Sequence, residues 1–222
     1  MAPILETHNL TKVYASDGVE TPALRGVDLA VAAGEFVSIM GPSGCGKSTL
    51  LYLLGLLATP TDGTVCIDGQ DTGSLGDGGR TRLRRRHIGY VFQRFNLLPT
   101  LSAEENVALA LRLRSERPGE APREMLRAVG LEDKRRRRPG QLSVGEQQRV
   151  AVARALVTQP TVLLADEPTG NLDSEASARV MDLVDRLHRQ RGQTVVLISH
   201  DPQVAERGDR LVRMRDGRFL DA

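Results

Sequence analysis

The 222-residue chain contains no tryptophan, and aromatic residues make up only 3% of it. A core built on stacked aromatic rings is therefore excluded, and aliphatic side chains must supply most of the packing. Hydrophobic residues account for 40% of the chain. This length and composition fit one domain, or one domain with an inserted subdomain.

Long hydrophobic runs are also missing. The stretch YLLGLLA, residues 52–58, is far shorter than the roughly 18 apolar residues that a membrane helix needs. The N-terminal stretch MAPILETHNL lacks the basic start and long apolar centre of a signal peptide. The only cysteines, Cys45 and Cys66, do not form a disulfide framework. We therefore expect a soluble, cytosolic protein.

Neither sign of charge dominates, since 30 basic residues oppose 28 acidic ones and leave a net charge of +2. Arginine runs at residues 80–86 and 134–138 carry no interleaved aromatic residues. We interpret them as solvated faces, some of which meet acidic lipid headgroups or a membrane partner, and we expect no nucleic acid ligand. The histidines His8, His87 and His188 show no metal-ligand spacing and receive no role.

Short apolar segments recur between helical patterns, which predicts an α/β protein with a mainly parallel sheet. Residues 36–40, 161–165 and 194–199 have the composition of buried strands. Residues 63–69 and 87–92 are predicted as more peripheral strands.

The chain divides by pattern into a core and a helical insertion. Apolar residues between 175 and 191 repeat at helical spacing on one stripe. From about residue 94 to 158 the patterns are helical, with breaks at Pro and Gly. We predict a single domain over 1–222, in which 1–93 and 159–222 form the catalytic core and 94–158 a helical subdomain.

The stretch GPSGCGKST follows a predicted strand and matches a phosphate-binding loop. Glycines let backbone N–H groups surround phosphate oxygens, Lys47 adds a positive charge, and the Ser48 hydroxyl is a ligand for Mg²⁺. The predicted phosphate contacts are Gly41, Pro42, Ser43, Gly44, Cys45, Gly46, Lys47, Ser48 and Thr49.

A second half-site follows the apolar run VLLA. Asp166 stands at the predicted carboxyl end of a strand, where it would complete the Mg²⁺ shell, and Glu167 would polarise the attacking water. Gln93 and His200 also follow predicted strands. Gln93 could reach the metal or the water, and His200 the γ-phosphate; position alone leaves a structural role open for each.

The stretch LSVGEQQRV, residues 142–150, resembles the signature motif of ATP-binding cassette (ABC) proteins. With the motifs above and NLD at 171–173, the resemblance covers nearly the whole chain in the family's order. It implies a P-loop NTPase cassette: a RecA-like core with a mainly parallel sheet, an antiparallel β part and the inserted helical subdomain. It also implies a homodimer in which each ATP lies between the phosphate loop of one copy and the signature of the other.

The resemblance assigns roles to single residues. Tyr14 would stack on adenine, although an ordinary strand tyrosine remains the alternative. Ser143 and the Gly145 N–H would contact the γ-phosphate across the dimer. Asp173 would link the two sites, and His200 would sense the γ-phosphate.

Two departures from the family pattern lie in the signature, which is LSVGE rather than LSGGQ. Val144 replaces a glycine, and we expect it to keep a negative φ because a β-branched residue avoids positive values. Glu146 places a carboxylate close to the γ-phosphate contact. A third departure, Cys45 beside Lys47, predicts a thiol that reacts faster than Cys66 if it is exposed.

Several stretches are similar to cassettes of the MacB/LolD type, including LLADEPTGNLD and the region around the phosphate loop. This resemblance implies an ATPase that powers a separate FtsX-like permease for export, lipoprotein release or mechanotransmission. The chain would then be peripheral on the inner face of the cell membrane. A soluble ABC ATPase of DNA repair or translation is one alternative, and a small-molecule P-loop kinase is another. The kinase alternative leaves the signature, Glu167 and His200 unexplained.

Overall fold

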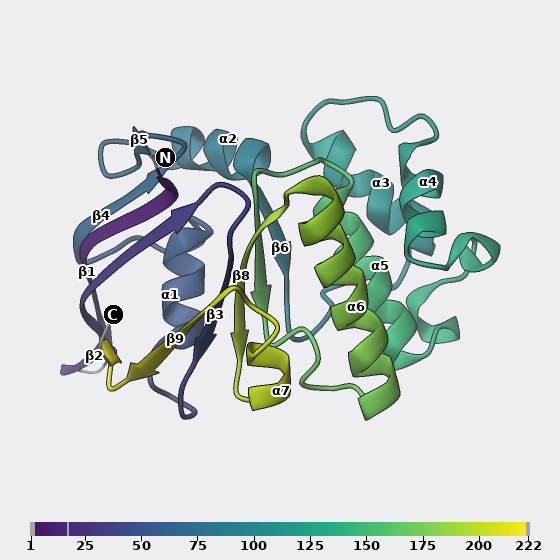
Figure 1. The fold of residues 1–222 in the computed structure, drawn as a ribbon. Coiled ribbons are helices and arrows are strands. Elements are labelled where there is room, and N and C mark those ends of the chain that lie inside the picture. Colours follow the sequence, from purple (N-terminus) through teal and green to yellow (C-terminus); the bar gives the residue numbers. More distant parts are fainter. Residues whose placement is uncertain (1–2, 17, 221–222) are drawn as a thin grey trace.

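The structure, a computed structural model, describes residues 3–16 and 18–220 and contains two sheets. The larger sheet has six strands in the order β10-β9-β3-β8-β7-β6 (Figure 1). All neighbours in it are parallel except the pair of β9 and β10. Its strands are β3 (Phe36–Met40), β6 (Ile88–Val91), β7 (Val162–Asp166), β8 (Thr194–Ser199), β9 (Arg210–Arg215) and β10 (Arg218–Leu220). The buried strands predicted at 36–40, 161–165 and 194–199 are thus confirmed, with β7 shifted by one residue.

The smaller sheet is antiparallel, with the order β2-β1-β4-β5. Its strands are β1 (Pro3–Ser16), β2 (Val19–Ala32), β4 (Asp62–Ile67) and β5 (Gln70–Asp71). The strand predicted at 63–69 is confirmed as β4 of this sheet, and the one at 87–92 as β6, an edge strand of the parallel sheet. The long β1–β2 hairpin has several register shifts, which interrupt the regular alternation from which a strand is recognised.

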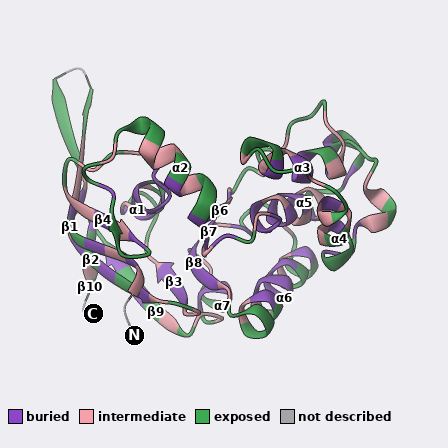
Figure 2. Ribbon diagram, turned by 90° about the horizontal axis from the view of Figure 1, so that it is seen from above, coloured by how far each residue is buried: buried purple, intermediate pink, exposed green. Residues whose placement is uncertain are grey.

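The helices cover both faces of the parallel sheet, as its parallel connections require (Figures 1 and 2). They are α1 (Lys47–Leu54), α2 (Asp77–His87), α3 (Ala103–Leu113), α4 (Ala121–Ala128), α5 (Val144–Leu156), α6 (Ser174–Arg191) and α7 (Pro202–Ala205), with short 3-10 helices η1 (Glu132–Lys134) and η2 (Pro139–Gln141). The elements from α3 to α5 fall within the segment 94–158 that the sequence predicts as a helical subdomain. The apolar stripe predicted within 175–191 is buried along α6.

The parallel sheet separates two hydrophobic cores. Leu163 and Leu197 pack into one core with α3, α4, α5 and α6. Their neighbours Leu164 and Val196 pack into the other, with α1 and the antiparallel sheet. This alternation follows from the two-residue period of a strand, and it explains why β7 and β8 read as continuous apolar runs.

Among the residues that the structure describes, no helix combines the length and the apolar character that a membrane crossing needs. The apolar stretch 52–58 instead contains the end of α1, where Leu53 and Leu54 are buried.

Candidate functional site

The predicted phosphate loop connects the end of β3 to the start of α1 (Figure 1). Gly46 caps α1 with a φ of 106°, and a Cβ added to it would lie 2.4 Å from the carbonyl oxygen of Ala23. A Cβ added to Gly41 would lie 2.1 Å from the carbonyl oxygen of Met214. Both positions therefore exclude any side chain, so the tight curve of the loop depends on these glycines.

The ammonium group of Lys47 lies inside this curve. The residue is only 6% exposed, and its Nζ donates hydrogen bonds to the carbonyl oxygens of Gly41 at 2.8 Å and Pro42 at 2.9 Å. The buried charge is thus paired with backbone carbonyl groups of the phosphate loop itself. A cation in a glycine-rich turn at a helix N-terminus is an anion-binding arrangement.

Ser48 and Asp166 meet although 118 residues separate them in the sequence. The Ser48 hydroxyl donates to Oδ1 of Asp166 at 3.1 Å, across the gap between the phosphate loop and the carboxyl end of β7. Burial raises the pKa of Asp166, and the nearby Glu167 raises it further, while the Ser48 hydrogen bond and Lys47 oppose the shift. A hydroxyl and a buried carboxylate are hard oxygen ligands of the kind that Mg²⁺ accepts beside phosphates.

Glu167 is held by groups from two neighbouring strand ends. Its Oε2 accepts a hydrogen bond from Nε2 of Gln93 at 3.2 Å, and Nδ1 of His200 lies 3.1 Å from its Oε1. Gln93 follows β6 and His200 follows β8. The structure therefore brings together the three side chains that the sequence placed at separate strand ends, and the carboxylate has a defined orientation.

The backbone of Glu167 adopts a φ of 43°, in the left-handed region. A residue other than glycine held there carries a strain of about 1–3 kcal/mol. Its N–H still donates to the carbonyl oxygen of Ile198 at 3.0 Å, so the chain leaves β7 hydrogen-bonded and then turns sharply. Nothing in the sequence signals this conformation, which directs the carboxylate toward Gln93 and His200.

The segment after Glu167 is tied to the same group. The side chain of Asn171 donates to the carbonyl oxygen of Gln93 at 2.9 Å. Asp173 caps α6, with its Oδ1 accepting from the N–H of Ala176 at 2.7 Å. Within this chain Asp173 therefore has a structural role as an N-cap, worth about 1 kcal/mol.

The signature stretch begins α5 with a reciprocal cap. The Ser143 hydroxyl accepts from the N–H of Glu146 at 3.3 Å, and Oε2 of Glu146 accepts from the N–H of Ser143 at 2.9 Å. Val144 is the first helical residue, is 47% exposed, and has the negative φ that the sequence predicts. Gly145 is buried, and a Cβ added to it would lie 2.9 Å from Cβ of Ala176 on α6. Its packing role against α6 was not visible in the sequence.

The phosphate loop and the signature belong to different parts of the molecule. Figures 1 and 2 show α1 and α5 on opposite sides of the strands β3 and β8. Within the described part of the chain, no hydrogen bond or ion pair joins residues 41–49 to residues 142–146. One copy therefore offers two phosphate-type turns that are not linked to each other.

Tyr14 lies on β1 and is 44% exposed, with Nζ of Lys12 5.0 Å from the centre of its ring. It is close enough to Tyr52 of α1 to help raise the pKa of that residue, after the larger effects of burial and Asp166. The side chain is thus partly open to solvent, with the Lys12 ammonium over the ring.

The two thiols differ from the sequence expectation. Cys45 is only 5% exposed, whereas Cys66 is partly exposed. The condition for a reactive Cys45 is not met, because the loop packs its side chain into the core with α1. Burial, with Asp71 and Glu6, raises the pKa of Cys66.

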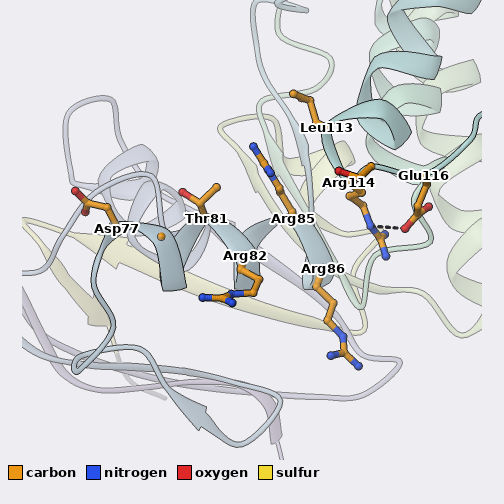
Figure 3. A pocket seen from close by; sticks show the side chains of 10 residues that line it. Asp77, Thr81, Arg82, Arg85, Arg86, Leu113, Arg114 and Glu116 are labelled. Carbon is orange, nitrogen blue, oxygen red and sulfur yellow. Dashed lines mark ion pairs between the residues drawn. The ribbon is translucent and has the colours of Figure 1, made fainter.

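A hollow of about 690 Å³ lies away from these residues, between α2 and the end of α3 (Figure 3). Four arginines line it: Arg82, Arg85, Arg86 and Arg114. Arg114 pairs with Glu116 at 2.9 Å. The side chains of the other three make no hydrogen bond or ion pair with the residues that the structure describes. Three arginines of the run 80–86, which the sequence predicts as a solvated face, thus line a basic hollow.

Comparison with known proteins shows the family of the chain. Residues 24–170 match the family described as ABC transporter. The lipoprotein-releasing system ATP-binding protein LolD of Anaeromyxobacter dehalogenans is 48% identical over 222 residues, covering 98% of this chain and 93% of the relative. The macrolide export ATP-binding/permease protein MacB of Syntrophobacter fumaroxidans is 46% identical over 219 residues, covering 96% of this chain but 31% of that longer protein.

Solved structures agree. The dimeric, post-hydrolysis ATP-binding cassette MJ0796 bound to ADP and Pi superposes with a TM-score of 0.91 at 44% identity, covering 98% of this chain and 97% of that one. A second dimeric structure of MJ0796, described as a bacterial ABC transporter cassette, gives a TM-score of 0.91 at 45% identity. The predicted cassette fold is confirmed, and the LolD and MacB relatives are consistent with the MacB/LolD type. The chain belongs to the ABC transporter family, as an ATP-binding subunit that hydrolyses ATP.

Proposed function

We propose that this subunit powers an FtsX-like permease on a separate chain, in a transporter of the MacB/LolD type that releases lipoproteins or exports a cargo. ABC subunits of this kind bind ATP, pair with a membrane permease and dimerise. The observation that carries the proposal is the cluster at the carboxyl ends of β6, β7 and β8, where Glu167 is held between Gln93 and His200 beside the Ser48–Asp166 pair. The names of the LolD and MacB relatives support the subtype.

ATP binding falls to the phosphate loop in this proposal. Backbone N–H groups of residues 43–49 and the ammonium of Lys47 receive the phosphates, and Tyr14 stacks on adenine. Ser48 and Asp166, whose hydroxyl and Oδ1 lie 3.1 Å apart, would hold Mg²⁺, and Gln93 would be a third ligand. Mg²⁺ supplies neutralisation of the phosphate charge when bound. The raised pKa of Asp166 fits this role, because a buried carboxylate gains most from a cation.

Glu167 acts as the base in this scheme. Gln93 and His200 fix its two carboxylate oxygens, so the carboxylate orients the attacking water and accepts its proton as the bond to the γ-phosphate forms. His200 also contacts the γ-phosphate. The strained backbone of Glu167 is compatible with a residue kept for position rather than for stability.

The signature serves the ATP of a second copy. Ser143 and the N–H of Gly145 lie at the N-terminus of α5, where a helix favours a negative group. We place the γ-phosphate of the partner's nucleotide there, next to Glu146, with Asp173 linking the two sites. Among the residues described, no hydrogen bond or ion pair joins the signature to the phosphate loop of the same copy, which is consistent with this arrangement.

The permease would dock over the basic hollow between α2 and α3 (Figure 3). A second, apolar hollow of about 320 Å³ shares Arg85, Leu113 and Arg114 with it. Leu113 is 51% exposed. This surface fits a segment of the permease that carries both acidic and apolar residues, and it would hold the subunit at the inner face of the cell membrane.

Glu167→Gln tests the proposal. The change keeps the shape of the side chain but removes the base, so ATP hydrolysis should fall by about 10²-fold or more. Trapped ATP·Mg should then stabilise a dimer by mass action. The measurement is size-exclusion chromatography with light scattering, with and without ATP·Mg, alongside phosphate release.

Two controls sharpen this experiment. Lys47→Ala in the same background should abolish the dimer by weakening nucleotide binding, and Ser143→Arg should abolish it while leaving binding to the monomer intact. A Ser143→Arg protein that dimerises normally would contradict the shared site. A Glu167→Gln protein that stays monomeric in ATP·Mg, both alone and with its permease, would also contradict the shared site.

A further inference from the structure

The signature contains an ion pair that its motif does not predict. Nζ of Lys134 lies 2.5 Å from Oε1 of Glu146. Lys134 ends η1, whereas Glu146 is in the first turn of α5. The side chains are 35% and 15% exposed, so the pair is partly shielded from solvent.

Both oxygens of the Glu146 carboxylate are engaged. Oε1 meets Lys134, and Oε2 accepts from the N–H of Ser143. The hydrogen bond from Lys134 holds the pKa of Glu146 below its usual range, the N–H of Ser143 lowers it further, and Arg149 contributes a weaker effect. Glu146 is therefore a fixed anion at neutral pH.

This anion lies in the same reciprocal cap as Ser143, the residue proposed to contact the partner's γ-phosphate. A carboxylate there benefits the N-terminus of α5, yet it repels a phosphate that approaches the same helix end. The Lys134 ammonium removes that conflict, because it neutralises the carboxylate without taking the oxygen that orients Ser143.

We propose that Lys134 is a positioning residue for ATP-driven dimerisation: it neutralises and orients Glu146 so that the signature can accept the nucleotide of a second copy. The inference rests on the proposed function of the signature. Lys134 is not proposed to touch ATP. It acts through Glu146, and its loss should therefore matter only while Glu146 carries a charge.

The test is a charge cycle in the Glu167→Gln background, in which ATP-dependent dimers are trapped. Lys134→Gln should raise the ATP concentration for half-maximal dimer formation by about tenfold, the size expected for a partly exposed charge interaction. Lys134→Gln combined with Glu146→Gln should return it to within about threefold of the parent, since the uncharged amide keeps an acceptor oxygen for the N–H of Ser143. Added salt should shrink the Lys134→Gln effect, because it partly screens the carboxylate that the variant leaves without its ammonium partner.

Arg136→Gln is the matched control. Arg136 lies two residues from Lys134 and is exposed, and its side chain has no hydrogen bond or ion pair with the described residues. Arg136→Gln removes one positive charge, as Lys134→Gln does, but breaks no ion pair. It should behave as the parent does. ADP binding to the monomer should be the same in all variants, which reports that the phosphate loop is folded.

The outcomes separate the two claims. A parent that dimerises while Lys134→Gln matches Arg136→Gln overturns the inference alone. A Lys134→Gln defect that Glu146→Gln fails to rescue also overturns it, because a structural tie between η1 and α5 explains that result. A parent that does not dimerise in ATP·Mg, either alone or with its permease, overturns the proposed function and this inference with it.

Discussion

Gly145→Ala should destabilise the protein, although alanine is the better helix former. The substitution gains up to about 1 kcal/mol in helix propensity within α5. The new Cβ, however, would lie 2.9 Å from Cβ of Ala176 on α6. Neither atom can rotate away, so α5 and α6 must separate, and overpacking of this kind costs about 1–3 kcal/mol. We expect a net loss of about 1 kcal/mol, which lowers the Tm by about 2–4 °C for a chain of this size.

Ala176→Gly provides the reciprocal change. Alone it should cost about 1 kcal/mol in helix propensity, but combined with Gly145→Ala it removes the contact and leaves the gain of the first substitution. The double variant should therefore unfold close to the parent and be more stable than the two single effects predict by addition. Thermal unfolding followed by circular dichroism, without nucleotide, measures all four proteins. Additive effects, or a Gly145→Ala protein as stable as the parent, would refute the packing argument.

Two further predictions follow from burial at the site. Asp166→Asn should stabilise the nucleotide-free protein at neutral pH, because the pKa of Asp166 is raised in the folded state. The protonated carboxyl group contributes fully to folding stability below the ordinary aspartate pKa. This contribution is lost as the pH rises through the folded pKa. Urea unfolding from pH 4 to 8 should show the advantage of Asn growing with pH, and a constant difference would contradict it. A neutral thiol reagent should modify Cys66 before Cys45 in the folded protein, because Cys45 is 5% exposed and Cys66 is not buried. Peptide mapping by mass spectrometry gives the order, and faster modification of Cys45 would show that the loop opens.

The central strands could be predicted because their signal is local. Residues 36–40, 162–166 and 194–199 are apolar runs, and both faces of these strands are covered by the two cores. The meeting of Ser48 and Asp166 was also accessible, since ligands collect at the carboxyl ends of parallel strands. The strand order was not, because it places residues 36–40 between 194–199 and 210–215, which only distant pairing decides.

Other features depend on contacts that no motif carries. Asn106 is fully buried, and its side chain accepts from the N–H of Leu98 and donates to three carbonyl oxygens between residues 98 and 102. From the sequence it is one polar residue in a helix. The left-handed backbone of Glu167 is likewise set by its surroundings, as glutamate has no preference for that region.

The partition of the interior by the parallel sheet has a mechanical consequence. Side chains on one face of β7 and β8 belong to the body built from α3 to α6, and their immediate neighbours belong to the body that holds α1. Close-packed interiors transmit strain rather than absorb it. A displacement of α3–α6 or of α1 would therefore strain β7 and β8. The carboxyl end of β7 is Asp166, and His200 directly follows β8. Asp166 and His200 therefore stand at the ends of strands that contact both cores, so a shift of α3–α6 relative to α1 would strain the backbone that positions them.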